Sequence, residues 1–293
     1  MIMRENLKKI ISDAKKSSST VEEIIKILDG SMAGLKTLII SGGPSLNNIS
    51  GEMIEALPED VIVIAVKQSF YKAPKRIDIH LINEDNYQVY DYASLDVSPF
   101  VIKVSSSSLV RCTPKSDEHL EFKISKESSK NFSQTLTNTC EFENWQLTNR
   151  VDRPWGPGIM YEIGIYLPLL LGCKEIYVAG WDLGDPKSNV INRFYENDNW
   201  LKIFRNIVIG FSPNFYNKFF NRVENFIRLG FFQFNNKVLL NIPGVTVNEA
   251  VLIAHSSKNL YKWLISKNIS LFVISDVSML SDLFERKDFF DVF

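Results

Sequence analysis

The stretch "LKTLIISGGPSL" at residues 35–46 combines the two features that decide the fold. An apolar run long enough for a buried strand ends in a turn that contains Gly42, Gly43, Pro44 and Ser45. Glycines let backbone amides approach a phosphate or nucleotide closely, but the turn matches neither G-x-G-x-x-G nor the GK[ST] of a phosphate loop. The turn therefore predicts either a nucleotide-binding loop or a plain strand-to-helix connection.

Further apolar runs follow at helix-length intervals and are apolar on both faces. They lie at residues 60–69, 78–83, 99–106, 174–183 and 269–275. Runs of this kind predict a mainly parallel sheet with helices on both sides, a Rossmann-like α/β core. We expect this core to comprise residues 35–186 and 244–293, with an N-terminal helical extension at 1–34 and an inserted helical lid at 187–243.

Three local signals set expected helix boundaries. Spaced apolar residues within 1–30 predict two helices, with Thr20 as the N-cap of the second and Gly30 at its end. A further helix is expected before the run at 174–183, kinked at Pro168 because proline lacks a backbone N–H.

The composition excludes several classes of protein. The net charge of -1 gives no general attraction to nucleic acid. The three cysteines lack the spacing of a zinc site or a disulfide framework, which favours a reducing cytoplasm, and no metal ligands are assigned. The N-terminus lacks the apolar core of a signal peptide, and the apolar stretches are too short to span a bilayer.

The segment 153–184 is the most distinctive part of the sequence, with a glycine-rich turn, a helix, a strand and a final loop. In one interpretation its glycines serve only packing within a tight unit. In the other, the backbone at Gly156 and Gly158 and the carboxylate of Asp182 face a ligand at the carboxyl edge of the sheet. The second interpretation also places Arg153 at a loop tip, as a catalytic candidate.

His255 lies in "AHSSKN" (254–259), where Ser256 or Ser257 resembles the N-cap of a following helix. A histidine just outside a helix N-terminus stays neutral, because the positive end of the helix dipole disfavours imidazolium. A neutral imidazole can act as a general base. The alternative is a surface or capping histidine without a chemical role.

The chain resembles the bacterial lipooligosaccharide sialyltransferases of glycosyltransferase family 42 and their 6-hydroxymethylpterin-pyrophosphokinase-like relatives. The likeness is carried by "LIISGGPSL", "LGCKEIYVAGWDL" and, most specifically, "AHSSKNLYKWLISKNISLFVIS". It implies that His255 is the general base and that Tyr195 contacts the departing phosphate. Residues matching the donor site are Gly42, Gly43, Pro44, Ser45, Gln68, Asn83 and Ser278. The chain departs from the family at Gly42 and Lys67, where the family has asparagines.

The resemblance implies a metal-independent, inverting transfer of a sialic-acid-like sugar from a CMP donor to a cell-surface glycan, without a cofactor. CMP leaves with a single phosphate, which Tyr195 and the amides of Gly156 and Gly158 would stabilise. One alternative is a pterin diphosphokinase-like transferase that holds Mg²⁺ at Asp182, Asp185 and Glu162. Another is a non-catalytic protein that binds nucleotide sugars.

Aromatic and basic residues alternate along the segment 199–237 of the expected lid. This mixture suits peripheral contact with anionic lipid on the inner face of the cytoplasmic membrane, where a lipid-linked glycan acceptor would be found. The alternative is that the aromatics pack inside the lid or between the subunits of a homo-oligomer.

Overall fold

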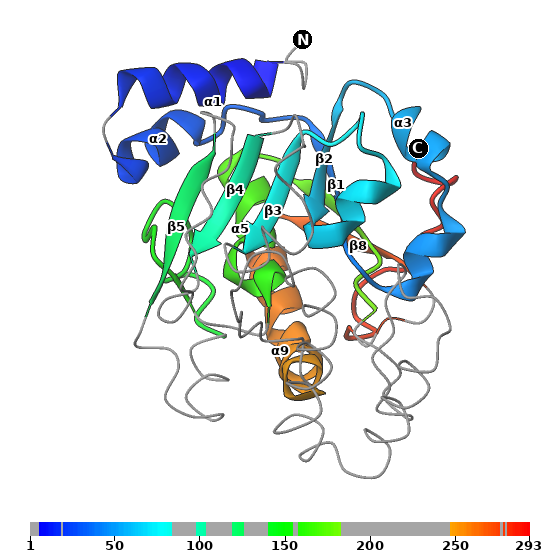
Figure 1. The fold of residues 1–293 in the computed structure, drawn as a ribbon. Coiled ribbons are helices and arrows are strands. Elements are labelled where there is room, and N and C mark those ends of the chain that lie inside the picture. The colour runs from blue at the N-terminus through cyan, green and yellow to red at the C-terminus, as the bar shows by residue number, and fades with distance from the viewer. Residues whose placement is uncertain are drawn as a thin grey trace, which may run out of the picture.

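The computed structural model describes residues 6–18, 20–83, 98–103, 119–125, 140–154, 158–182, 247–275, 278 and 280–293. These residues form an α/β fold around one sheet (Figure 1). The strand order is β6-β5-β4-β3-β2-β1-β7-β8, with parallel pairing throughout. The strands are β1 Lys36–Ile40, β2 Val61–Val66, β3 Ile79–Asn83, β4 Ser98–Lys103, β5 Leu120–Ser125, β6 Arg153–Pro154, β7 Glu175–Ala179 and β8 Ser270–Ile274. The predicted fold class is confirmed.

All six predicted apolar runs contain strands, whereas β5 and β6 were not predicted. The β5 sequence "LEFKIS" alternates, with Leu120 and Phe122 buried and Lys123 exposed. This is the pattern of a strand with one covered face, not of a strand buried on both faces. β6 has two residues, too few for a periodic signal.

The central strands divide the hydrophobic core into two clusters, one on each face of the sheet. In β2, Ile62 and Ile64 belong to the first cluster, and Val63 and Ala65 belong to the second. Successive side chains of a strand point to opposite faces, so a strand buried along its whole length is apolar at nearly every position. This explains the continuous apolar runs of β1, β2 and β7.

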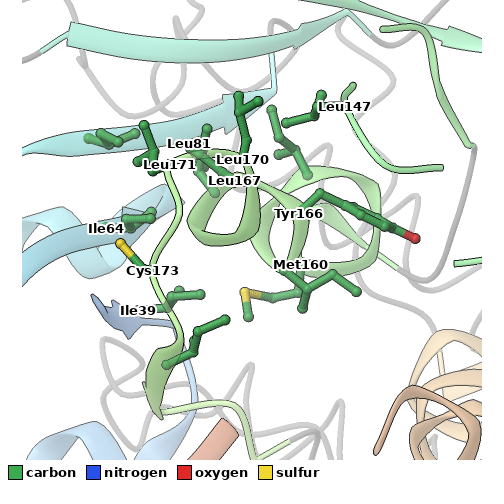
Figure 2. Close-up of a cluster of buried hydrophobic side chains, with 14 of the residues drawn as sticks. Ile39, Ile64, Leu81, Leu147, Met160, Tyr166, Leu167, Leu170, Leu171 and Cys173 are labelled. Atoms are coloured by element: carbon green, nitrogen blue, oxygen red, sulfur yellow. The ribbon is translucent and has the colours of Figure 1, made fainter. Parts of the chain in front are cut away.

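One face of the sheet is covered by α5 (Tyr166–Leu170) and the preceding π-helical turn η6 (Met160–Gly164). Figure 2 shows Leu167 and Leu170 of α5 and the following Leu171 beside Leu81 of β3, on the face of the sheet that also carries Ile39 and Ile64. The irregularity expected at Pro168 lies before that residue, in η6, where the Ile165 amide bonds to the Met160 carbonyl. Pro168 has no N–H to donate to the Gly164 carbonyl, so the regular hydrogen-bond pattern is interrupted where η6 meets α5.

The N-terminal helices α1 (Asn6–Ser17) and α2 (Val21–Leu28) pack on this same core (Figure 1). Thr20 and Glu23 form a capping box at the start of α2, and Gly30 follows the helix with a φ of 69°. Both predicted boundaries are therefore confirmed. The apolar stripes of α1 and α2 join the first core cluster, so this part of the segment 1–34 packs directly on the core.

Three short helices and one long helix connect or flank the strands. After β1 come the 3-10 helix η1 (Pro44–Asn48) and α3 (Gly51–Glu55), and after β2 comes the 3-10 helix η2 (Lys67–Lys72). The long helix α9 (Val247–Ser266) leads into β8. Within the ranges that the structure describes, no helix has the length and apolar character needed to cross a membrane.

The connections create one topological switch point. From β1 the sheet grows in one direction as far as β6, after which β7 and β8 add on the opposite side of β1. Open parallel sheets bind ligands beyond the carboxyl ends of the strands at such a point. The carboxyl ends of β1 and β7 are thus the first place to search for a site.

Candidate functional site

The segments that follow β1 and β7 remain paired beyond the sheet. We call residues 41–45 the β1 loop and residues 180–182 the β7 loop. The Ser41 amide donates to the Ala179 carbonyl at 2.8 Å, and the Gly43 amide donates to the Gly180 carbonyl at 2.6 Å. A β-carbon at Gly43 would lie 2.4 Å from the Gly180 oxygen, and one at Gly180 would lie 2.4 Å from the Ser41 oxygen. Only glycine fits this close approach of two backbones.

Asp182 ties the two loops to the end of β8. Its carboxylate accepts hydrogen bonds from the Ser45 amide, the Ser45 hydroxyl and the Ser275 hydroxyl, each at 2.7 Å. The side chain is buried, and among the described residues no cation forms an ion pair with it. Three donors compensate the carboxylate for the water it has lost. Asp182 is therefore the junction of β1, β7 and β8.

This network corrects two expectations about the β1 loop. The Asp182 carboxylate was expected to face a ligand, but its oxygens are already bonded within the protein. In one of the two interpretations of the loop its amides approach a phosphate or nucleotide, but those of Gly43 and Ser45 are used internally and Pro44 has none. Within the described part of the chain, the Gly42 amide alone in this loop donates to no acceptor. Gly42 is therefore the open position of the loop.

The end of β2 adds a second open group at this edge. Ser69 accepts a hydrogen bond from the Val66 amide and donates to the Ile40 carbonyl, which fixes η2 against the end of β1. Gln68 is buried to 6% exposure, and its side-chain amide makes no hydrogen bond in the part of the chain that the structure describes. The fully buried side-chain atoms without a partner in the described residues do not include those of Gln68, so its amide reaches solvent and is open to a ligand. Asn83, the last residue of β3, ends at the same edge.

His80 of β3 contacts the residue before Gln68, a contact for which the sequence contains no signal. Its Nε2 lies 2.7 Å from the Lys67 carbonyl, which can only accept, so Nε2 carries the proton. Burial lowers the pKa of His80 to about 4, although the hydrogen bond to Lys67 opposes the shift. Lys67 has a φ of 53°, uncommon for a residue with a side chain. The neutral imidazole thus holds the strained residue that precedes Gln68.

Arg153 is not the loop-tip residue that the sequence suggested. It lies on β6 with 0% exposure, and its guanidinium donates to the carbonyls of Trp145, Arg150 and Glu162. It also lies 4.8 Å from the centre of the Tyr166 ring. A guanidinium whose donors are used by backbone carbonyls has a structural role, so its assignment as a catalytic candidate is wrong.

His255 does not precede a helix. The helix α9 begins at Val247, so His255 lies in its middle and the dipole argument for a neutral imidazole is wrong. Ser256 and Ser257 are not N-caps but buried residues with distant partners. Ser256 Oγ lies 3.0 Å from the Tyr161 hydroxyl, and Ser257 Oγ accepts from the Ser281 amide.

The periodicity of α9 places position 255 relative to the core. The buried residues of the helix form one stripe: Ile253, Ser256, Ser257, Leu260 and Leu264. With 100° per residue, position 255 falls on the opposite side, in line with exposed Lys258, Asn259 and Lys262. The described contacts therefore join Gly43, Ser45 and Asp182, and they do not bring position 255 to that group.

Two further predicted residues are placed near the β7 loop. Ser278 Oγ donates to the Trp181 carbonyl at 2.7 Å, which holds the C-terminal segment beside Asp182. Gly158 has a φ of 87°, and its carbonyl accepts from the amides of Tyr161 and Glu162, so it starts the turn η6. The ring of Tyr161 contacts that of Trp181 and so connects η6 with the β7 loop.

The remaining predictions lie outside the described residues. They concern Tyr195, Gly156, Asp185 and the insertion 187–243 with its aromatic and basic segment. Among the residues that the structure describes, no group of three His, Cys, Asp or Glu side chains is arranged to hold a metal ion.

Comparison with known proteins gives a limited result. No protein-family model matches the chain, and no curated protein matches it. Among solved structures, the chain is similar to the sialyltransferase CstII from Campylobacter jejuni, described in complex with a substrate analogue, cytidine-5'-monophosphate. The sequence identity is 14% over 87% of this chain and 85% of that chain, with a TM-score of 0.41. Values of this size describe a loosely similar chain path and say nothing of substrate.

Proposed function

We propose that the protein is a glycosyltransferase that binds a CMP-activated, sialic-acid-like sugar at the carboxyl edge of β1, β2 and β7 and transfers it to a glycan hydroxyl. The observation that carries the proposal is the pair of open polar groups at the switch point, the Gly42 amide and the Gln68 side chain. Ligands of open parallel sheets bind at such a point. The sequence blocks that resemble the sialyltransferase family support the choice of donor.

The kinase-like alternative is disfavoured by the state of its candidate ligands. A diphosphokinase would need oxygen ligands for Mg²⁺. Asp182 already accepts three hydrogen bonds, and Glu162 lies in the interior at 6% exposure on the turn η6. Asp185 lies outside the described residues. Two of the three proposed ligands would have to leave their present environments to bind a metal.

In this proposal His255 takes the proton of the acceptor hydroxyl, and Tyr195 donates a hydrogen bond to the departing phosphate. The helical periodicity of α9 puts position 255 on the side opposite to the buried stripe, and this placement supports a role outside the packing of that stripe. General-base catalysis is typically worth about 10²–10⁴-fold in rate. The acceptor would then approach α9 from the side opposite to its core contacts.

The first experiment measures donor binding by calorimetry. We expect CMP to bind without added metal and ATP with Mg²⁺ to bind weakly or not at all. Gln68→Leu removes the open amide while keeping an apolar body, and we expect it to weaken CMP binding about tenfold, the effect of one buried hydrogen bond. Tight binding of ATP with Mg²⁺, and none of CMP, would transfer the proposal to the kinase-like alternative.

The second experiment tests the role of His255. His255→Ala should reduce transfer by at least about 10²-fold while leaving CMP affinity unchanged, because a general base acts in the transition state. Lys262→Ala is the matched control, since it lies on the same side of α9 and is exposed. If His255→Ala keeps most of its kcat, His255 is a surface residue and another base must be sought.

A further inference from the structure

The hydrogen bonds around Asp182 have the composition of an anion site. A backbone amide and two hydroxyls, from Ser45 and Ser275, converge on one carboxylate at 2.7 Å. Amides and hydroxyls at a glycine-containing turn are the groups with which proteins bind phosphate. Here the anion belongs to the protein itself, since Asp182 is 1% exposed and lies against Gly43.

We infer that Asp182 is a positioning residue whose carboxylate permanently occupies the anion-binding site formed by the β1 loop and Ser275. It holds the loop in a conformation in which the Gly42 amide is not hydrogen-bonded within the described residues. Because the Ser45 amide and hydroxyl donate to Asp182, they are not available to a phosphate of the ligand. This inference rests on the proposed nucleotide site. The loop then contacts the nucleoside or sugar part of the donor, and the phosphate is bound by groups elsewhere.

Geometry and charge support this assignment independently. A β-carbon at Gly43 would lie 2.5 Å from Asp182 Oδ2, so the carboxylate fills the space beneath the loop. A phosphate placed on Ser45 would also meet an adjacent buried carboxylate, and like charges at short distance in a partly dry site repel strongly. The loop therefore cannot bind a phosphate at Ser45 while Asp182 stays in place.

The inference predicts that geometry, not charge, is what Asp182 supplies to ligand binding. Asp182→Asn keeps an oxygen for the Ser45 amide, and its NH₂ group can donate to the two hydroxyls, which can turn to accept. We expect Asp182→Asn to bind CMP within about threefold of the wild type. Asp182→Ala leaves the loop without its anchor, and we expect its CMP affinity to fall at least about tenfold.

Added formate should distinguish an anchored anion from general damage. In Asp182→Ala, formate can enter the vacated place and accept the same three hydrogen bonds, so we expect it to raise the melting temperature and to restore part of the CMP affinity. Ser275→Ala keeps the carboxylate and serves as the matched control, with a small loss of affinity and no response to formate. If Asp182→Ala folds only with formate present, that outcome also supports the inference.

Three results would overturn the inference. Asp182→Ala could bind CMP as tightly as the wild type or more tightly, which would mean that the loop takes the phosphate once Asp182 is gone. Asp182→Asn could lose binding as completely as Asp182→Ala, which would place the negative charge in contact with the ligand. Formate could have no effect on the stability of Asp182→Ala. Failure of the wild type to bind CMP would refute the proposed function instead, and the formate experiment on stability would still decide the role of Asp182.

Discussion

The buried imidazole of His80 should make the stability of the protein depend on acid. Burial lowers the pKa of His80 from 6.5 to about 4 in the folded protein, whereas in the unfolded chain it returns to its ordinary value. Between these values the unfolded state binds a proton that the folded state does not. The contribution of His80 to the free energy of unfolding is then constant above about pH 6.5 and falls as the pH drops toward 4.

The size of the effect follows from the shift. Each pKa unit corresponds to about 1.4 kcal/mol, so a shift from 6.5 to about 4 corresponds to about 3 kcal/mol between pH 7 and pH 4. This is a large fraction of the stability of an ordinary domain. The imidazolium keeps its Nε2–H for the Lys67 carbonyl, so the loss of stability comes from the burial of the charge and not from this hydrogen bond.

The assay is urea unfolding at several pH values between 7 and 4.5, compared with the variant His80→Gln. Glutamine keeps a side-chain N–H for the Lys67 carbonyl but does not titrate in this range. The variant loses packing against Phe70, whose ring centre lies 5.0 Å from that of His80, so its stability is lower at every pH. The informative quantity is the slope, which should be steeper in the wild type. Equal slopes in both proteins would refute the reasoning.

Three other substitutions test separate parts of the structure. Gly43→Ala should lower the free energy of unfolding by about 3 kcal/mol and weaken CMP binding, because its β-carbon would lie 2.4 Å from a backbone oxygen. Its control is Gly34→Ala, which meets no atom within 4 Å but has a φ of 89°. This control should lower the free energy of unfolding by about 1–2 kcal/mol and leave CMP binding unchanged. Arg153→Lys should cost about 3 kcal/mol in urea unfolding, since an ammonium cannot reach three carbonyls, and a loss of activity without a loss of stability would restore its catalytic assignment. Tyr161→Phe should cost about 1 kcal/mol by removing the hydrogen bond to Ser256, and an unchanged melting temperature would show that this bond is not formed in solution.

The sheet was predictable because its signal is local. A strand buried on both faces is mostly apolar along its length, and the apolar runs that predicted β1, β2, β3, β4, β7 and β8 carry this signal. The capping box at Thr20 and the turn at Gly30 are likewise decided by neighbouring residues. β5 was not predicted, because its burial alternates and it therefore lacks a continuous apolar run. The alternation of apolar and polar residues in "LEFKIS" is itself the signal of a strand with one covered face and could have predicted it.

The site was less predictable because its residues act through distant partners. Ser256 has the appearance of an N-cap in the sequence, but its hydroxyl bonds to Tyr161, 95 residues away. Asp182 looks like a polar loop residue, but its donors come from Ser45 and Ser275. A serine can cap a helix or satisfy a buried partner, and only the tertiary structure decides between these uses. Gln68 and Asn83 could be assigned to the carboxyl edge of the sheet from the sequence, because each lies at the carboxyl end of a predicted strand.

The position of β1 has a consequence for how the chain folds during synthesis. β1 is made early, yet its second neighbour β7 lies some 140 residues later in the sequence, and β7 in turn pairs with β8 near the end. Until residue 179 has left the ribosome, one side of β1 presents unpaired backbone groups between apolar side chains. Such an open edge is a template for pairing with other chains. Nascent or truncated forms that end before β7 should therefore depend on chaperones more than forms in which β7 has paired with β1.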